Sequence, residues 1–152
     1  MPIVWRHILG AARHTRCRLS HGWHGVVFTA LAKGKGKTMD YNAIIYEAKL
    51  EARKLGQAFL DEYYGGQDAG MCGFAWVNVR PMNKGNTKAG KEERKVLRAM
   101  GFELDWTGKE FQLWNPSGLG CQNVDAKYAG AKAAASILRE HGFNASAGLR
   151  LD

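Results

Sequence analysis

The order of hydrophobic patterns between residues 74 and 151 most constrains what this chain can fold into. Runs rich in aromatic and β-branched residues alternate with segments of helical periodicity, and glycine or proline separates them. The predicted elements are a strand at 74–79, a helix at 88–100, strands at 102–106 and 111–114, a helix ending at His141 and a strand at 145–151. This β-α-β-β-α-β order predicts a ferredoxin-like α+β unit, in which a four-stranded antiparallel sheet carries two helices on one face.

The two predicted helices of this unit end in the same way. Gly101-Phe102 follows the first helix, and Gly142-Phe143 follows the second. Glycine readily takes the left-handed conformation that closes a helix, and the next apolar residue then packs back under the last turn. The repeat supports two β-α-β halves.

A further helix is predicted from residue 40 to 63, ahead of the unit. Asp40 or Asn42 can cap its first turn. Its apolar residues recur at helical spacing and form one face, which needs a partner surface. They are Ile45, Ala48, Ala52, Leu55 and Phe59. We therefore expect one α+β domain over residues 39–152.

Residues 1–38 form a basic arm of different composition. The arm carries seven lysines and arginines and no acidic residue, so of the net charge of +8 it holds +7, and residues 39–152 hold +1. Three interpretations stay open: a targeting presequence, leader sequence ahead of a start at Met39, and a disordered basic tail. Gly25–Leu31 is apolar enough for a short strand.

Cysteine usage and hydropathy restrict the compartment. Cys17, Cys72 and Cys121 are odd in number and widely spaced, so no disulfide framework is expected, and a reducing compartment fits best. No run of about 18 apolar residues occurs, so we expect neither a transmembrane helix nor a membrane partner.

The strongest candidate for binding is a set of basic residues on the 88–100 helix and the loop before it. Lys88, Lys91, Lys95 and Arg98 share one helical face. The full set, called the basic patch below, is Lys84, Lys88, Lys91, Arg94, Lys95 and Arg98. Nucleic-acid phosphates are one expected partner. A plain solvated helix face is the alternative, because Glu92 and Glu93 partly neutralise it.

The predicted central strands offer aromatic side chains. Phe74, Trp76 and Asn78 fall on one face of the first strand, and Gln112 and Trp114 fall on the matching face of its neighbour. Trp76 and Trp114 are therefore candidates for stacking nucleic-acid bases. We expect instead that the 40–63 helix lies across this face and buries both.

Two segments resemble phosphate-binding loops. Gly85–Lys91 matches the spacing of such a loop, but Glu92 stands where a hydroxyl should hold Mg²⁺, and Gly36-Lys37-Thr38 lacks the first glycine. Nucleotide hydrolysis is therefore not expected. A small phosphorylated ligand held at Gly85–Lys91 remains a hypothesis.

Signals for catalysis and metal binding are weak. Residues His14, Cys17, His21 and His24 offer ligand types, but their spacing is not that of a structural zinc site. Cys121 precedes a helix N-terminus, which would lower its pKa, yet no base lies beside it in sequence. We expect no catalytic residue, no metal and no cofactor, and a protein that is not an enzyme.

Several segments resemble small bacteriophage and prophage proteins that have no assigned activity. They are Asp105–Lys109, Phe111–Ser117, Gln122–Lys127 and Gly148–Asp152. The resemblance covers about residues 72–152 and excludes the arm. It implies an accessory protein made in the cytoplasm of an infected bacterium, and it carries over no functional residue.

Three functions follow as hypotheses. The leading one is non-catalytic binding of nucleic acid or a nucleoprotein through the basic patch. The second is inhibition of a host or anti-phage defence enzyme through an exposed aromatic patch. The third is binding of a small phosphorylated ligand at Gly85–Lys91.

Overall fold

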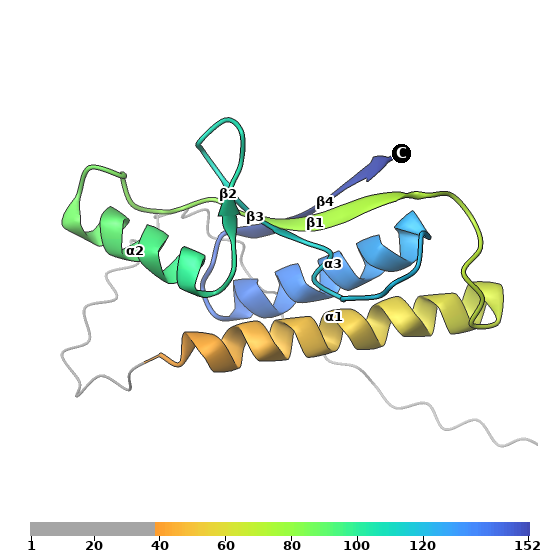
Figure 1. The fold of residues 1–152 in the computed structure, drawn as a ribbon. Coiled ribbons are helices and arrows are strands. Elements are labelled where there is room, and N and C mark those ends of the chain that lie inside the picture. The colour runs from red at the N-terminus through yellow and green to blue at the C-terminus, as the bar shows by residue number, and fades with distance from the viewer. Residues whose placement is uncertain (1–38) are drawn as a thin grey trace, which may run out of the picture. The chain divides into compact units, whose positions relative to one another are not determined.

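The computed structural model of the chain describes residues 39–152 (Figure 1). They form an α+β fold with three helices and one open four-stranded antiparallel sheet. The elements in chain order are α1 Tyr41–Tyr64, β1 Gly73–Val79, α2 Lys88–Ala99, β2 Glu103–Leu104, β3 Phe111–Trp114, α3 Val124–Glu140 and β4 Ala145–Leu151.

The strands lie in the order β2-β3-β1-β4, and each neighbouring pair is antiparallel. The predicted four-stranded antiparallel sheet is thus confirmed. β1 is central, and its Trp76 lies opposite Trp114 of β3 on one side and Gly148 of β4 on the other. This register sets which side chains meet on each face of the sheet.

Burial alternates along β1, so its two faces differ. Ala75, Val77 and Val79 are buried, whereas Phe74 is exposed and Trp76 and Asn78 are half-buried. Buried side chains of all three helices and of β3 complete the core around the inward face, among them Ala48, Leu97, Phe111 and Leu138.

The helices α1 and α3 pack against each other on one side of the sheet (Figure 1). Small residues let their backbones approach closely. A Cβ atom built on Gly130 would lie 2.7 Å from the carbonyl oxygen of Ala52, and one on Gly56 would lie 3.0 Å from that of Ala126. α3 in turn packs on β1 and β4.

The helix α2 does not lie over the sheet as predicted. It sits at one end of the sheet (Figure 1), and it enters the core through Leu97 near its last turn, followed by Met100. Glu93 accepts hydrogen bonds from the backbone N–H groups of Met82 (2.8 Å) and Asn83 (2.9 Å). These bonds fold the 80–87 loop back on α2, and α1 rather than α2 lies beside α3.

The predicted helix endings are confirmed. Gly101 and Gly142 have φ values of 90° and 86°, in the left-handed region. The N–H of Phe102 donates to the carbonyl of Leu97, and that of Phe143 donates to the carbonyl of Leu138. Both are the 6→1 bond of a glycine-closed helix end.

The predicted apolar face of the first helix was partly wrong. Ile45, Ala48 and Ala52 are buried, but Leu55 is 42% exposed and Phe59 is only partly buried. Gly56 and Leu60 take their places at the interface. The buried stripe drifts because an α-helix has 3.6 residues per turn, and glycine at 56 admits α3 more closely than a leucine would.

The 102–106 strand was also predicted too long. Only Glu103 and Leu104 pair with β3. Trp106 lies in the loop between β2 and β3 and is 95% exposed. Asp105 stops the strand, because its carboxylate accepts from the N–H groups of Lys109 and Glu110 (both 3.0 Å). A six-residue loop, 105–110, therefore joins the two strands.

No helix within residues 39–152 is both long and apolar enough to cross a membrane. The arm at 1–38, with its predicted short strand, lies outside the described residues, and the division into an arm and one domain stays a prediction.

Candidate nucleic-acid interface

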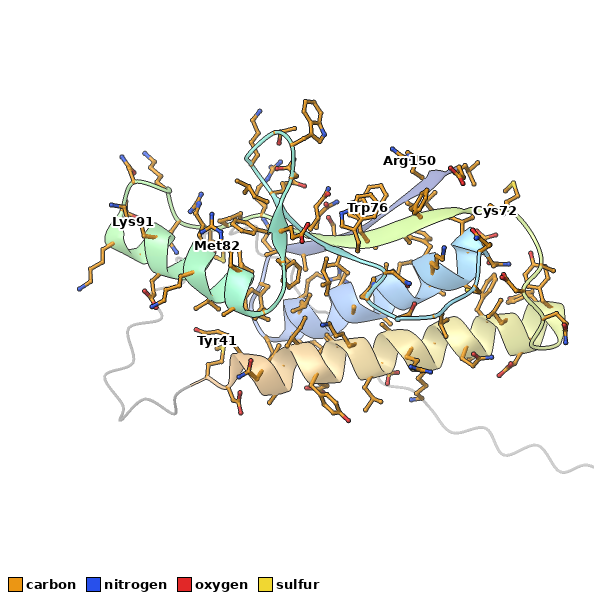
Figure 2. The ribbon with its side chains drawn as sticks, viewed as in Figure 1. Tyr41, Cys72, Trp76, Met82, Lys91 and Arg150 are labelled. Atoms are coloured by element: carbon orange, nitrogen blue, oxygen red, sulfur yellow. The ribbon has the colours of Figure 1, made fainter. Side chains whose placement is uncertain are left out.

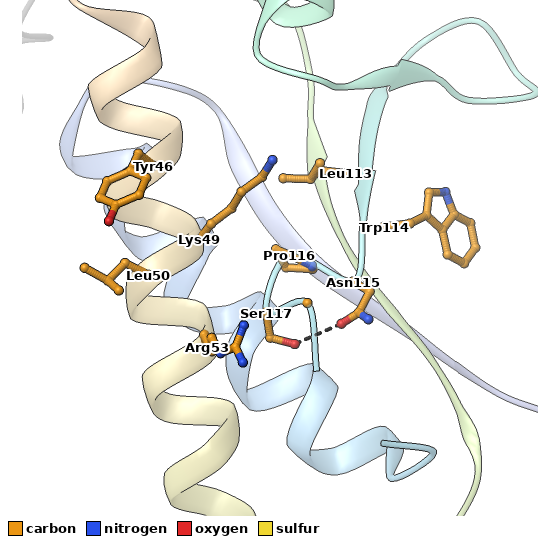
Figure 3. A pocket seen from close by; sticks show the side chains of 10 residues that line it. Tyr46, Lys49, Leu50, Arg53, Leu113, Trp114, Asn115, Pro116 and Ser117 are labelled. Atoms are coloured by element: carbon orange, nitrogen blue, oxygen red, sulfur yellow. Dashed lines mark hydrogen bonds between the residues drawn. The ribbon is translucent and has the colours of Figure 1, made fainter. Parts of the chain in front are cut away.

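The helix α1 does not cover the aromatic face of the sheet, so that expectation was wrong. Leu113 points toward α1 in Figure 3, whereas Trp114, the next residue of β3, points to the opposite side. Figure 2 shows Trp76 and Arg150 on the side of the sheet away from α1 and α3. The helix α1 packs its buried face against α3, so the second face of the sheet stays open.

Three aromatic side chains gather on this open face, and we call them the aromatic cluster. The ring centroids of Trp76 and Trp114 lie 4.7 Å apart with a 32° angle between the planes. Phe74 meets Trp114 edge-on, with centroids 6.2 Å apart and planes at 75°. Trp114 is 46% exposed and Phe74 38% exposed, so the cluster presents ring surface to solvent.

Trp76 is held at the base of the cluster. A Cβ on Gly148 would lie 2.7 Å from the Trp76 ring, so only glycine leaves room for the indole to pack against β4. Its Nε1–H donates to Asn78 Oδ1 at 3.0 Å. The ring is thus oriented before any ligand arrives, which lowers the entropy lost on binding.

Positive side chains flank one end of the cluster. The Arg150 guanidinium carbon lies 5.6 Å from the Phe74 ring centroid, and Lys127 Nζ lies 5.7 Å from it. Lys127 is nearly buried and donates to the Gly73 carbonyl at 2.9 Å, whereas Arg150 is exposed. Arg150 is therefore the cation available to a phosphate beside the rings.

Polar side chains occupy the other end of the open face. Asn78 Oδ1 accepts a second hydrogen bond, from Gln112 Nε2 at 3.0 Å. One cross-strand row further on, Arg80 pairs with Glu110 at 2.8 Å. The face thus changes from aromatic to polar along β1.

The β2–β3 loop rises from the sheet on the side away from α1 and α3 (Figure 1). The carboxylate of Asp105 organises it, since it also accepts the hydroxyl of Thr107 at 2.5 Å. That bond and the backbone N–H groups of Glu110 and Lys109 hold the pKa of Asp105 below its ordinary value. The ordered loop carries the exposed indole of Trp106.

Within the basic patch, Lys84, Lys88, Lys91 and Lys95 are exposed, and Lys91 lies in the first turn of α2 (Figure 2). The two arginines have structural contacts. Arg94 donates to the carbonyls of Asn83 and Gly90 (both 3.1 Å), and Arg98 lies 5.5 Å from the Phe111 ring centroid. We call the four exposed lysines the lysine set; they are available to phosphates, as is the exposed Arg98.

The Gly85–Lys91 segment does not have the geometry of an open phosphate loop. Thr87 caps α2 and its hydroxyl accepts from the N–H of Gly90 at 3.0 Å. A Cβ on Gly90 would meet the carbonyl oxygen of Lys84, so an acceptor rather than a donor covers the start of the helix. This arrangement does not favour the phosphorylated-ligand hypothesis.

The geometry around Cys121 and His141 offers no catalytic pair. Burial, and next the charge of Asp68, raise the pKa of the Cys121 thiol, so the expected lowering was wrong. His141 closes α3, and its Nε2 lies 3.4 Å from Glu47 on the surface. Residues 39–152 contain no group of three potential metal ligands. The earlier candidates at 14–24 lie outside the described part of the chain.

A groove of about 430 Å³ separates α1 from the end of β3 on the opposite side of the sheet (Figure 3). Tyr46, Leu50 and Arg53 of α1 line it together with Pro116 and Ser117. Ser117 is held by its hydrogen bond to Asn115 Oδ1 at 2.9 Å.

Sequence reasoning missed Gly148 and Arg150 as parts of the interface. Both depend on the β1–β4 register, which places Gly148 opposite Trp76 and Arg150 opposite Phe74. Gly148 and Arg150 alternate with Ala147 and Leu149 along β4, so the sequence indicates that they share one face of the strand. It does not indicate which residues of β1 lie opposite them, because that depends on how the two strands pair.

Comparisons of the chain with protein-family models, with curated proteins and with solved structures found no match.

Proposed function

We propose that this protein binds single-stranded nucleic acid, without catalysis, by stacking bases on the aromatic cluster. The observation that supports this most is the packing of α1 against α3, which leaves Phe74, Trp76 and Trp114 open on the two central strands. Stacking on an aromatic side chain contributes about 1–3 kcal/mol per base and tolerates any base. A duplex keeps its bases stacked inside, so the face is suited to single strands.

The charges around the aromatic cluster support a path for the single-stranded nucleic acid along β1. Arg150 lies at one end of the open face, and the loop with Lys84 follows the other end in the chain. The seven residues of β1 span roughly 20 Å, enough for a few nucleotides. Residues 39–152 carry a net charge of only +1, so stacking supplies much of the affinity and the lysine set adds phosphate contacts.

The test is a binding titration with fluorescein-labelled single-stranded DNA and RNA 12-mers at about 50 mM salt. The full chain is compared with Trp114→Ala, and Tyr46→Ala serves as control because Tyr46 is a 69% exposed aromatic on α1. We expect Trp114→Ala to weaken binding about tenfold or more and Tyr46→Ala to leave it unchanged. Equal affinity of all three chains would contradict the proposal.

The proposal extends to origin and fold. The chain is an accessory protein of bacteriophage type acting in the host bacterial cytoplasm. The segment from β1 to β4 is a modified ferredoxin-like unit, in which α2 lies at one end of the sheet and α1 takes its place beside α3. The strand order β2-β3-β1-β4 supports this description of the fold.

A second candidate is a protein-binding inhibitor of a host or defence enzyme. Trp114 and Trp106 are both exposed, and tryptophan is enriched among residues that dominate protein interfaces. Affinity capture from nuclease-treated bacterial lysate separates the two functions. A partner that survives nuclease and is lost with Trp106→Ala or Trp114→Ala would favour the inhibitor.

A further inference from the structure

A polar pocket of about 210 Å³ opens on the same face of the sheet as the aromatic cluster. The residues lining it come from three strands and their ends: Asn78, Arg80, Glu110, Asn144 and Ser146. Ser146 lies opposite Asn78 in the β1–β4 register, one row beyond the Trp76–Gly148 pair. Successive rows on one face lie about 7 Å apart, so the pocket begins next to the aromatic rings.

The hydrogen bonds in and beside the pocket fix which polar atoms remain free. Asn78 Oδ1 accepts from both Trp76 Nε1 and Gln112 Nε2, so the amide nitrogen of Asn78 is turned away from them as a donor. Glu110 Oε1 accepts from Arg80 Nε (3.1 Å) and Nη2 (2.8 Å). Among the described residues, Glu110 Oε2 and Asn78 Nδ2 have no hydrogen-bond partner.

The charge of Glu110 would by itself repel a nucleic acid. Arg80 neutralises it, so the pair presents carboxylate acceptors without a net negative charge. A carboxylate suits a base edge that carries two neighbouring N–H donors, and an amide N–H suits a carbonyl beside them. Of the four common bases, guanine has this edge, with N1–H and the 2-amino group as donors and O6 as acceptor.

We propose that this pocket binds a guanine base by its Watson–Crick edge, next to bases stacked on the aromatic cluster. Glu110 Oε2, the oxygen that Arg80 does not occupy, accepts from both the N1–H and the 2-amino group through its two lone pairs, and Asn78 Nδ2 donates to O6. The inference rests on the proposed function, and it adds a base preference to binding that stacking alone would leave without one.

The test varies one base in the ligand and leaves the protein unchanged. The full chain is titrated with single-stranded pyrimidine 8-mers, DNA and RNA, whose one central position holds guanine, adenine, uracil or thymine, cytosine, or inosine. We expect guanine to bind about fivefold or more tightly than the other three bases. Inosine lacks the 2-amino group and should lose most of that advantage. Equal binding of guanine and inosine, or no preference for guanine, would overturn the proposal.

A variant then assigns the preference to the pocket. Glu110→Gln keeps the size of the side chain, and Glu62→Gln, an exposed glutamate on α1, is the control. We expect Glu110→Gln to reduce the guanine preference below about twofold while the all-pyrimidine 8-mer binds as before. Asn78→Ser is the second variant, and its guanine preference should also fall below about twofold. Because Asn78 also accepts from Trp76 Nε1, this variant should bind the all-pyrimidine 8-mer more weakly as well, and its preference is therefore taken as the ratio of the two affinities. A preference retained in both variants would refute the pocket.

Failure of the pocket is distinguishable from failure of the proposed function. If the pocket proposal alone fails, the pyrimidine 8-mers still bind and Trp114→Ala still weakens them. If no 8-mer binds, or if Trp114→Ala has no effect on any of them, the proposed function itself fails.

Discussion

At the scale of single residues, a glycine controls the position of the largest ring on the open face. Gly148 leaves room for the Trp76 indole, which in turn supports Trp114. The carboxylate of Asp105 has a comparable role in the β2–β3 loop, where it gathers a hydroxyl and two backbone N–H groups. Each residue can be tested without altering a side chain that would touch the ligand.

Gly148→Val should lift the Trp76 ring off β4, since the added Cβ would lie 2.7 Å from it. The indole would lose its bond to Asn78, and we expect oligonucleotide binding to weaken about tenfold, the lower part of the stacking range. Near-UV circular dichroism reports the ring, and a binding titration reports the affinity. Gly120→Val is the control, because nothing lies within 4 Å of a Cβ there. Equal affinities of the two variants would contradict this role of Gly148.

The Asp105 carboxylate should stay ionised to a pH below its ordinary pKa of about 3.9. Since the folded pKa is the lowered one, its contribution to stability is present above the unfolded pKa and is lost as pH falls through the folded pKa. NMR titration of the Lys109 and Glu110 amides should show a midpoint below 3.9. A midpoint at or above that value would mean that the loop bonds do not form.

At the scale of elements, the decisive contact is the one between α1 and α3. Predictions that depend on local chemistry were accurate: the aromatic strand β1 and the glycine-closed ends of α2 and α3 follow from a few neighbouring residues each. The surface covered by the 40–63 helix could not be predicted. An apolar stripe shows that a helix is buried, and it does not show against what.

Gly130→Val should destabilise the α1–α3 contact, because even its Cβ would lie 2.7 Å from the Ala52 carbonyl oxygen. Overpacking of this kind costs about 1–3 kcal/mol, which urea unfolding can measure. Ala129→Val, at the neighbouring partly exposed position, controls for the helix propensity of valine. If both variants unfold at the same urea concentration, the close approach of the helices is refuted.

Replacing the lysines of α2 should change the salt dependence of nucleic-acid binding, but it should not abolish binding. Replacing Lys88, Lys91 and Lys95 by glutamine removes up to three phosphate contacts, so the slope of log affinity against log salt should shrink by about 2. The matched control is the triple exchange of Lys49, Lys54 and Lys132 by glutamine. An unchanged slope in the α2 variant would show that these lysines form a solvated face only.

At the scale of the whole molecule, most of the net charge and the proposed binding face belong to different parts of the sequence. The net charge of +8 belongs almost entirely to residues 1–38, and the open face combines aromatic rings with a few polar and charged groups. Composition pointed to the arm, and helical spacing pointed to the basic patch. The aromatic cluster was visible as alternating residues in two strands, but its exposure depended on how all three helices pack, and the role of Gly148 depended on strand register.

The central claim is that nucleic-acid bases stack on Trp76 and Trp114. The most direct measurement is the fluorescence of a full chain in which Trp5, Trp23 and Trp106 are replaced by phenylalanine, so that only these two indoles emit. Stacked bases quench indole emission, and we predict that saturating single-stranded 12-mers remove a large part of it while a duplex of equal length does not. Binding of the single strand without any change in this emission would contradict the account.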